Sequence, residues 1–252
     1  MEFSIEHGMS VRRVGRGPEI VWIHGLGESS TSFDPCVGHP ALAGFTHVLV
    51  DLPGYGRSAW TAAPTTLAAL ADHVAAWLVP RPPAILVGHS MGGVLATLVA
   101  ERGPARAVID VDGNLSHGDC TFSLMAATDT LGEFTARGFA TMRDAVYARG
   151  LDAVPLRGYH AAMAFASPAV FHAHATDLVA MSDVEDLAPR LANLACPHLF
   201  VAGVPDGICA YSRGLLDQHH VRWVGLEPAG HWVYLDQLEQ FAHHVAAFIT
   251  TI

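Results

Sequence analysis

The chain has 252 residues, of which 51% are hydrophobic and 15% are charged, and its formal net charge is −10. This apolar content is enough to form one sizeable core in a single domain. The 14 Lys and Arg residues form no basic run, which argues against nucleic acid and anionic membranes as partners, because both attract clustered cations. No apolar run approaches the ~18 residues that a membrane-spanning helix requires.

The first residues, MEFSIEHGMSVRRVG, lack the apolar stretch of a secretory signal peptide. The cysteines are scattered without CxxC spacing, so they indicate neither a zinc site nor a disulfide framework. They are Cys36, Cys120, Cys196 and Cys209. We therefore expect a cytoplasmic protein with reduced thiols.

The strand pattern begins with a hairpin, because residues 2–6 and 9–15 alternate in polarity around a His-Gly turn. Runs of continuous hydrophobicity follow, which is typical of strands buried on both faces of a parallel sheet. These runs are 19–25, 47–56, 84–90, 107–113, 198–207 and 221–231.

Helix patterns separate several of these strands. Apolar residues recur at i, i+3, i+4 and i+7 within 65–80, and further helices are predicted over 94–103 and 235–249. Because strands and helices alternate, the predicted fold class is α/β, with a mostly parallel, doubly wound sheet.

The alternation breaks once, between residues 115 and 194, where no convincing strand appears. A structureless loop of that length is unusual inside a compact domain. We interpret 115–194 as a helical cap inserted after the sixth strand, with 1–114 and 195–252 forming the core.

Residues 88–93, GHSMGG, join an apolar strand to an apolar helix and contain the G-x-S-x-G pattern of a nucleophile elbow. The tight turn holds Ser90 in a strained conformation, and a Cβ at Gly88 or Gly92 would collide with the neighbouring strand and helix. The turn also aims the N-terminus of the following helix so that the backbone N–H of Met91 can donate to a developing oxyanion. Ser90 is therefore the predicted nucleophile.

With these segments in place, the chain resembles the α/β-hydrolase fold superfamily over nearly its whole length. The matching segments, in the order typical of that superfamily, are HGLGESSTSF (24–33), DLPGYGRS (51–58), GHSMGG (88–93) and PAGHW (228–232). The resemblance implies a serine esterase or lipase-like enzyme with an α/β-hydrolase fold and a helical cap. It also implies Leu26 as the second oxyanion donor, through its backbone N–H, since Gly25 lets that amide face inward.

Among sixteen histidines, His231 is the predicted general base. It follows a strand, comes directly after Pro-Ala-Gly and precedes the final helix, so its imidazole can lie over the serine at the carboxyl edge of the sheet. The adjacent pairs at 219–220 and 243–244 fall in or near helices. No carboxylate at ligand spacing accompanies them, so no metal site is predicted.

Two carboxylates compete for the role of the acid that orients His231. Asp206 follows the seventh strand and matches the superfamily's G-x-x-D pattern, which favours it slightly. Asp112 follows the sixth strand in a DGNL segment that is similar to the Glu-Gly-Asn-Leu of one subgroup. Both remain candidates because neighbouring strands lie only about 5 Å apart, and Asp110 is a weaker third candidate.

A serine at the elbow predicts attack on a carbonyl and an acyl-enzyme, hence hydrolysis of a small or medium apolar ester, lactone or thioester. Two alternatives stay open: a C–C bond hydrolase or cofactor-free perhydrolase on the same triad, and a ligand-binding receptor that has lost turnover. No nucleotide fingerprint is present, so no cofactor is expected.

Apolar side chains of the predicted cap, together with the residue after His231, are expected to line the substrate pocket. The candidates are Phe122, Met125, Phe139, Phe165 and Trp232. The partner they imply is a small apolar molecule, and the sequence leaves its identity and the oligomeric state open.

Overall fold

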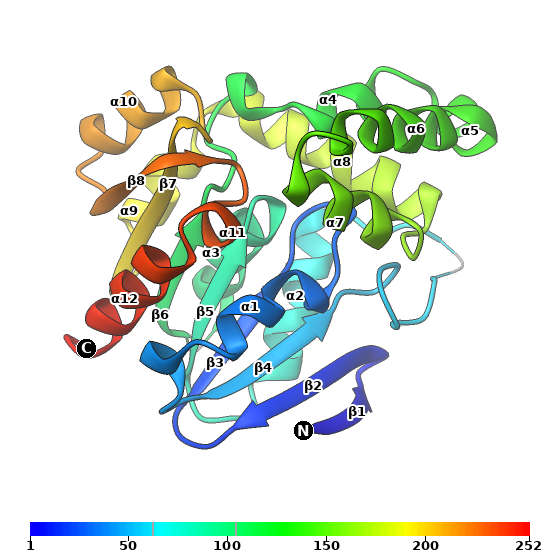
Figure 1. Ribbon diagram of the computed structural model, residues 1–252. Coiled ribbons are helices and arrows are strands. Elements are labelled where there is room, and N and C mark those ends of the chain that lie inside the picture. The colour runs from blue at the N-terminus through cyan, green and yellow to red at the C-terminus, as the bar shows by residue number, and fades with distance from the viewer. Residues whose placement is uncertain (62, 104) are drawn as a thin grey trace.

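The computed structural model describes residues 1–61, 63–103 and 105–252, which form an eight-stranded sheet with helices on both faces (Figure 1). The strands lie in the order β1-β2-β4-β3-β5-β6-β7-β8. All neighbouring pairs from β4 to β8 are parallel, whereas β2 is antiparallel to both of its neighbours. The predicted fold class is therefore confirmed. The strands are β1 Glu2–Glu6, β2 Met9–Gly15, β3 Glu19–Ile23, β4 Thr46–Asp51, β5 Ala84–His89, β6 Ala105–Val111, β7 His198–Asp206 and β8 Trp223–Gly230.

The predicted N-terminal hairpin is present as β1 and β2. Its two turn residues, His7 and Gly8, have φ angles of 49° and 77°. A two-residue turn with both central residues in the left-handed region matches the twist of the flanking strands, and glycine adopts that region without strain.

The sheet is buried where the sequence is continuously apolar. Every residue of β5 is buried, and so are all residues of β3 and β4 after the first. Helix α3 (Met91–Arg102), which follows β5, is buried along Met91–Val99. A helix that is apolar all round must lie inside the protein. The element that begins at the serine elbow is thus fixed rigidly in the core.

Helices cover the sheet on two sides. In Figure 1, α1, α11 and α12 lie in front of the sheet, and α2 and α3 lie behind it. The helices of the core are η1 Ser30–Phe33, α1 Asp34–Val37, η2 Pro40–Leu42, α2 Leu67–Leu78, α3, α10 Ala210–Gln218, α11 Val233–Asp236 and α12 Leu238–Ile249.

Between β6 and β7 the described residues form helices and no strand. In Figure 1, helices α4 to α8 lie across the end of the sheet at which the parallel strands finish. We call residues 115–194 the cap segment. Its helices are η3 His117–Asp119, α4 Phe122–Ala127, α5 Leu131–Glu133, η4 Phe134–Gly138, α6 Phe139–Gly150, α7 Val154–Met163, α8 Pro168–Val184 and α9 Leu187–Ala192.

None of the helices in the described part of the chain is long and apolar enough to cross a membrane. The cysteines at positions 36, 120, 196 and 209 are all free thiols.

Candidate active site

Ser90 lies at the junction of β5 and α3 with φ 56° and ψ −124°. A positive φ is strained for a serine, and such strain persists only where the surrounding structure imposes it. The surroundings here are backbone atoms: a Cβ at Gly88 would collide with the carbonyl oxygen of Gly92, and a Cβ at Gly92 would collide with that of Ile23. The two glycines thus let the strand, the turn and the helix pack closely enough to hold Ser90 in this conformation.

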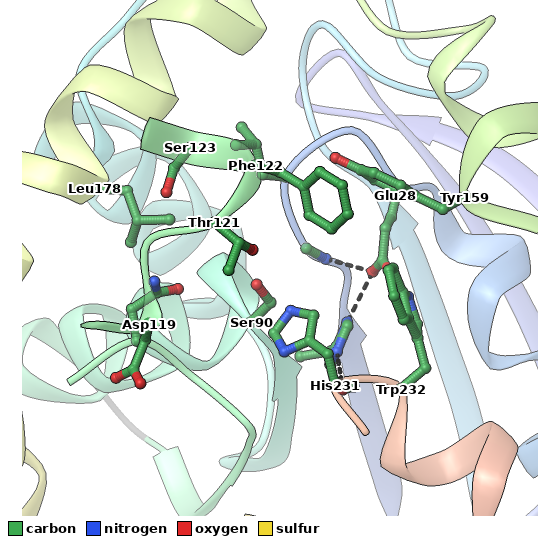
Figure 2. Close-up of a pocket in the computed structure, with 14 residues that line it drawn as sticks. Glu28, Ser90, Asp119, Thr121, Phe122, Ser123, Tyr159, Leu178, His231 and Trp232 are labelled. Atoms are coloured by element: carbon green, nitrogen blue, oxygen red, sulfur yellow. Dashed lines mark hydrogen bonds and ion pairs between the residues drawn. The ribbon is translucent and has the colours of Figure 1, made fainter. Parts of the chain in front are cut away.

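His231 lies in the loop between β8 and α11, and its Nδ1 donates a hydrogen bond to Oδ2 of Asp112 over 2.6 Å. Figure 2 shows the Ser90 side chain beside the imidazole ring of His231. With the proton of the neutral ring on Nδ1, its Nε2 is an acceptor. The hydrogen bond to Asp112 thus fixes the orientation of the ring beside Ser90.

Asp112 follows β6 in a left-handed conformation, with φ 53°, and its side chain is fully buried. Its second oxygen, Oδ1, accepts hydrogen bonds from the backbone N–H groups of Gly203 (3.0 Å) and Ile208 (3.1 Å). Hydrogen bonds from three donors compensate the carboxylate for the loss of water and fix its direction.

The slight preference for Asp206 over Asp112 needs correction, because the structure brings Asp112 and not Asp206 to His231. Strand β7 continues as far as Asp206, which pairs with Gly230 of β8 and is exposed. Asp110 does not replace either of them, since it accepts a hydrogen bond from the backbone N–H of Gly113.

The two backbone N–H groups that are predicted to bind an oxyanion belong to segments that meet at Ser90. Met91 is the first residue of α3, and Leu26 follows Gly25 in the loop after β3. Among the described residues, neither of these two N–H groups donates to another protein group. Because Gly25 has no side chain, the loop after β3 can approach Ser90 closely: a Cβ at Gly25 would lie only 3.1 Å from Cβ of Ser90.

The loops around the site are braced by groups that lie behind it. His24 donates from Nδ1 to the carbonyl oxygen of Gly25 and accepts at Nε2 from the N–H of Leu52. Asp51 accepts from the N–H groups of Ser30 and Arg57. These bonds connect the loop after β3 to the loop after β4.

Glu28 and His89 form a buried ion pair next to the site, which the sequence analysis did not identify. Oε2 of Glu28 lies 3.0 Å from Nδ1 of His89, and their exposed fractions are 2% and 1%. Burial favours the neutral form of Glu28, but its hydrogen bonds and the charge of His89 outweigh burial and lower its pKa to about 2. Burial likewise lowers the pKa of His89, and the Glu28 carboxylate outweighs this effect, so that the His89 pKa is raised. Both residues belong to segments quoted above, in which Glu28 comes three residues after Gly25 and His89 directly precedes Ser90.

A cavity opens over Ser90, between the sheet and the cap segment. Figure 2 shows that one wall is aromatic and another is polar, with Ser90 and His231 between them. The aromatic wall consists of Phe122, Tyr159 and Trp232, whose ring centroids lie 4.9 to 6.2 Å apart. The other lining residues include Asn114, Asp119, Thr121, Ser123 and Leu178. No Lys or Arg is among the described residues that line this cavity.

Of the five predicted pocket residues, Phe122 and Trp232 line this cavity, whereas the other three do not. Met125 is 46% exposed and lines a different cavity, on the cap segment. Phe139 packs against Phe134 and Phe171 inside the cap segment. Phe165 is 63% exposed and lines a cavity between α7 and the loops that follow β3 and β4. The apolar character of Phe139 is explained by this packing.

Comparison with known proteins places this geometry in a family. Residues 20–244 match the family model described as "Alpha/beta hydrolase family". The chain belongs to the alpha/beta hydrolase family. Among curated members, it is 27% identical to the pimeloyl-[acyl-carrier protein] methyl ester esterase of Xanthomonas campestris pv. campestris, over 97% of this chain and 100% of the relative.

Solved structures share the alpha/beta hydrolase fold at lower sequence identity. A thermophilic esterase from Thermogutta terrifontis superposes with a TM-score of 0.79 at 20% identity, covering 96% of this chain and 93% of the esterase. The enol-lactonase from Burkholderia xenovorans LB400 superposes with a TM-score of 0.75 at 21% identity, covering 99% of this chain and 100% of the lactonase. At these identities the likeness concerns the fold.

Proposed function

We propose that this member of the alpha/beta hydrolase family is a serine hydrolase that cleaves a carboxylic ester through an acyl-enzyme on Ser90. The observation that carries the proposal is the hydrogen bond from His231 to the buried Asp112, beside a serine held at positive φ. Nucleophile, base and orienting acid in this arrangement are the parts that acyl transfer requires.

In the first half of the reaction, Oγ of Ser90 attacks the ester carbonyl carbon while Nε2 of His231 takes the hydroxyl proton. Asp112 accepts the Nδ1–H and stabilises the imidazolium that forms. The carbonyl oxygen becomes an oxyanion, which accepts hydrogen bonds from the N–H groups of Leu26 and Met91. Collapse of this intermediate breaks the ester bond, and His231 returns its proton to the departing alkoxide, so that an alcohol leaves.

In the second half, a water molecule attacks the acyl group on Ser90 while His231 takes one of its protons. The same two N–H groups bind the oxyanion. The bond to Oγ then breaks, His231 protonates Ser90, and the carboxylic acid is released. The two half-reactions together convert an ester and water into an alcohol and a carboxylic acid, so no group besides the protein and water is needed.

The cavity supports an uncharged substrate with a short chain. Its aromatic wall can contact an apolar acyl or alkoxy group, and its polar wall offers hydroxyl and amide partners. Because no described lining residue is Lys or Arg, and His89 is already paired with Glu28, a carboxylate inside the cavity would have no free cation to pair with. The Xanthomonas campestris relative is named as the esterase of a methyl ester, which is likewise an uncharged ester group.

We further propose that the cap segment, inserted between the core segments 1–114 and 195–252, closes the cavity, since Phe122 and Tyr159 come from α4 and α7. A cytoplasmic location, an uncharged small-molecule ester as partner and the absence of a cofactor are parts of the same proposal.

Labelling with a fluorophosphonate tests the nucleophile, because this reagent mimics the tetrahedral intermediate and requires an activated serine. We expect stoichiometric labelling of the parent and none of Ser90→Ala. His231→Ala should slow labelling by orders of magnitude, whereas the control His243→Ala, at an exposed position of α12, should not. Labelling that persists in Ser90→Ala would overturn the assignment.

The alternatives left open by the sequence give other results. A ligand-binding receptor without turnover is not labelled. A C–C bond hydrolase is labelled but hydrolyses p-nitrophenyl acetate poorly compared with its own substrate, and a perhydrolase is labelled but transfers the acyl group to added hydrogen peroxide. Turnover of simple esters by the labelled parent that is lost in Ser90→Ala, and that gives no peracid with hydrogen peroxide, therefore identifies the esterase.

A further inference from the structure

We propose that Glu28 and His89 are a charged positioning pair that fixes the oxyanion-hole loop and the loop of the catalytic base relative to each other. This inference rests on the proposed function of Ser90 and His231. The pair touches both of these loops but not the reacting atoms, so it acts through the groups that it holds.

The contacts of Glu28 reach three segments of the chain. Its Oε2 accepts from the backbone N–H of Gly25 over 2.8 Å and from Nδ1 of His89 over 3.0 Å. Its Oε1 accepts from the indole Nε1–H of Trp232 over 2.6 Å. One carboxylate thus binds the residue before the Leu26 oxyanion donor, the residue before Ser90 and the residue after His231.

His89 completes the connection through its other ring nitrogen. Nε2 of His89 lies 2.8 Å from the carbonyl oxygen of His231. A carbonyl oxygen only accepts, so Nε2 must carry a proton. The carboxylate of Glu28 accepts from the N–H groups of Gly25 and Trp232, which favours its ionised form, and an ionised carboxylate 3.0 Å from Nδ1 requires a proton on that nitrogen as well. The contacts therefore require a doubly protonated, positively charged His89.

A buried ion pair is poor evidence of a gain in stability, because removing two charges from water costs as much as their attraction returns. What the pair provides instead is a fixed position for the two loops to which it is hydrogen-bonded. Each of its hydrogen bonds ends on a loop that carries a reacting group, and each is shorter and stronger for being charge-assisted. An apolar pair of the same size could fill the space but could not set the distance between the Leu26 amide and His231.

The pair also lies close to the base. The ring centroids of His89 and His231 lie 4.7 Å apart, and Glu28 contacts the opposite nitrogen of His89. The ring that the pair positions is thus its immediate neighbour. The other titratable groups around the pair are His24, Tyr159, Tyr234 and Asp110.

The chain contains a matched control for this pair. Glu6 of β1 accepts from the indole of Trp77 over 2.8 Å and pairs with Arg13 of β2 over 2.5 Å. It therefore has the same kinds of partners as Glu28, but in the hairpin at the edge of the sheet. Glu6→Gln removes a carboxylate from an ion pair without touching the site.

The kinetic test compares Glu28→Gln with Glu6→Gln on p-nitrophenyl acetate. Gln keeps the size of Glu28 and an acceptor for the N–H of Gly25 but removes the charge. Loss of a whole oxyanion donor costs about 100- to 1000-fold in kcat, so a displaced donor should cost about tenfold or more, with KM changed by less than about threefold. Glu6→Gln should alter neither kcat nor KM.

The direct test is the protonation of His89, followed by NMR of protein labelled with ¹⁵N-histidine and assigned with His89→Gln. We expect two protonated ring nitrogens for His89 at pH 7 in the parent and one in Glu28→Gln. A singly protonated His89 in the parent, or a Glu28→Gln variant with the kcat of Glu6→Gln, would overturn the proposal. The NMR needs no substrate, so this failure differs from failure of the proposed function, which shows as an unlabelled Ser90 in the parent.

Discussion

The carboxylate of Asp112 lies 2.6 Å from Nδ1 of His231, although the two residues are 119 positions apart in the chain. Neighbouring strands bring them together: β6 ends one residue before Asp112, β7 pairs with β6, and β8, which pairs with β7, ends one residue before His231. The contact thus depends on the carboxyl ends of parallel strands meeting at one edge of the sheet.

This contact predicts a large loss of activity in Asp112→Asn. An amide at this position can donate to the imidazole and favour the wrong tautomer, which costs on the order of ten-thousandfold in kcat in a triad of this kind. Asp206→Asn is the matched control, since it removes the exposed carboxylate at the end of β7, and it should keep kcat within about twofold. Hydrolysis of p-nitrophenyl acetate by both variants measures this. Equal losses in the two variants would contradict the assignment.

The aromatic wall predicts that Phe122 limits the length of the acyl chain. Truncation to Ala removes a ring that contacts Tyr159 and enlarges the cavity above Ser90. We expect the ratio of kcat/KM for p-nitrophenyl hexanoate over acetate to rise by about tenfold in Phe122→Ala. Met125→Ala, on the same helix but 46% exposed, is the control and should leave the ratio unchanged. An unchanged ratio in both variants would show that Phe122 does not border the acyl chain.

The absence of Lys and Arg from the described lining of the cavity predicts discrimination against anionic esters. Dimethyl succinate and monomethyl succinate differ in one methyl group, and at neutral pH only the second carries a carboxylate. Burying that charge without a cation is costly, so kcat/KM for the diester should exceed that for the monoester by at least about tenfold. Both rates are to be divided by those of alkaline hydrolysis. Equal values would indicate that the free carboxylate stays in water or meets a cation.

The buried carboxyl group of Asp110 should make the stability of the folded protein depend on pH. Burial raises the pKa of this carboxyl to about 8, with a further increase from the nearby Asp112, while the N–H of Gly113 acts in the opposite direction. The unfolded chain releases this proton near the ordinary value of 3.8, whereas the folded protein keeps it until about pH 8. The free energy of unfolding should therefore fall between these values, by up to about 1.4 kcal/mol per pH unit from this group.

Asp110→Asn tests that dependence, because an amide resembles the protonated acid and carries no charge at any pH. Thermal denaturation at pH 5 and pH 8 should show the variant gaining melting temperature over the parent as the pH rises. Parallel changes in the two proteins would mean that Asp110 is already ionised when folded.

Much of the fold could be predicted from the sequence because its signals are local. Continuous apolar runs indicate buried parallel strands, and the His-Gly pair at 7–8 and the glycines around Ser90 report backbone conformations within a few residues. The loops that carry Ser90 and His231 were identified in the same way. The shared order of these segments pointed to the alpha/beta hydrolase family, of which the chain is a member.

The direction of individual side chains could not be predicted in this way. Asp206 and Asp112 both follow strands of the sheet, and only the packing of the strand ends distinguishes the exposed carboxylate from the one that contacts His231. Met125 and Phe122 lie on the same short helix, yet one faces outward and the other borders the cavity.

The sequence by itself thus determined the alternation of strands and helices and the position of the strained serine, since both follow from polarity and steric limits between near neighbours. Only the tertiary structure decided which acid meets His231, which cap residues face Ser90, and that Glu28 contacts His89 from 61 positions away. The physical reason is that a hydrogen bond requires two groups within about 3 Å and correctly oriented. Across such separations, packing of the whole chain sets both conditions.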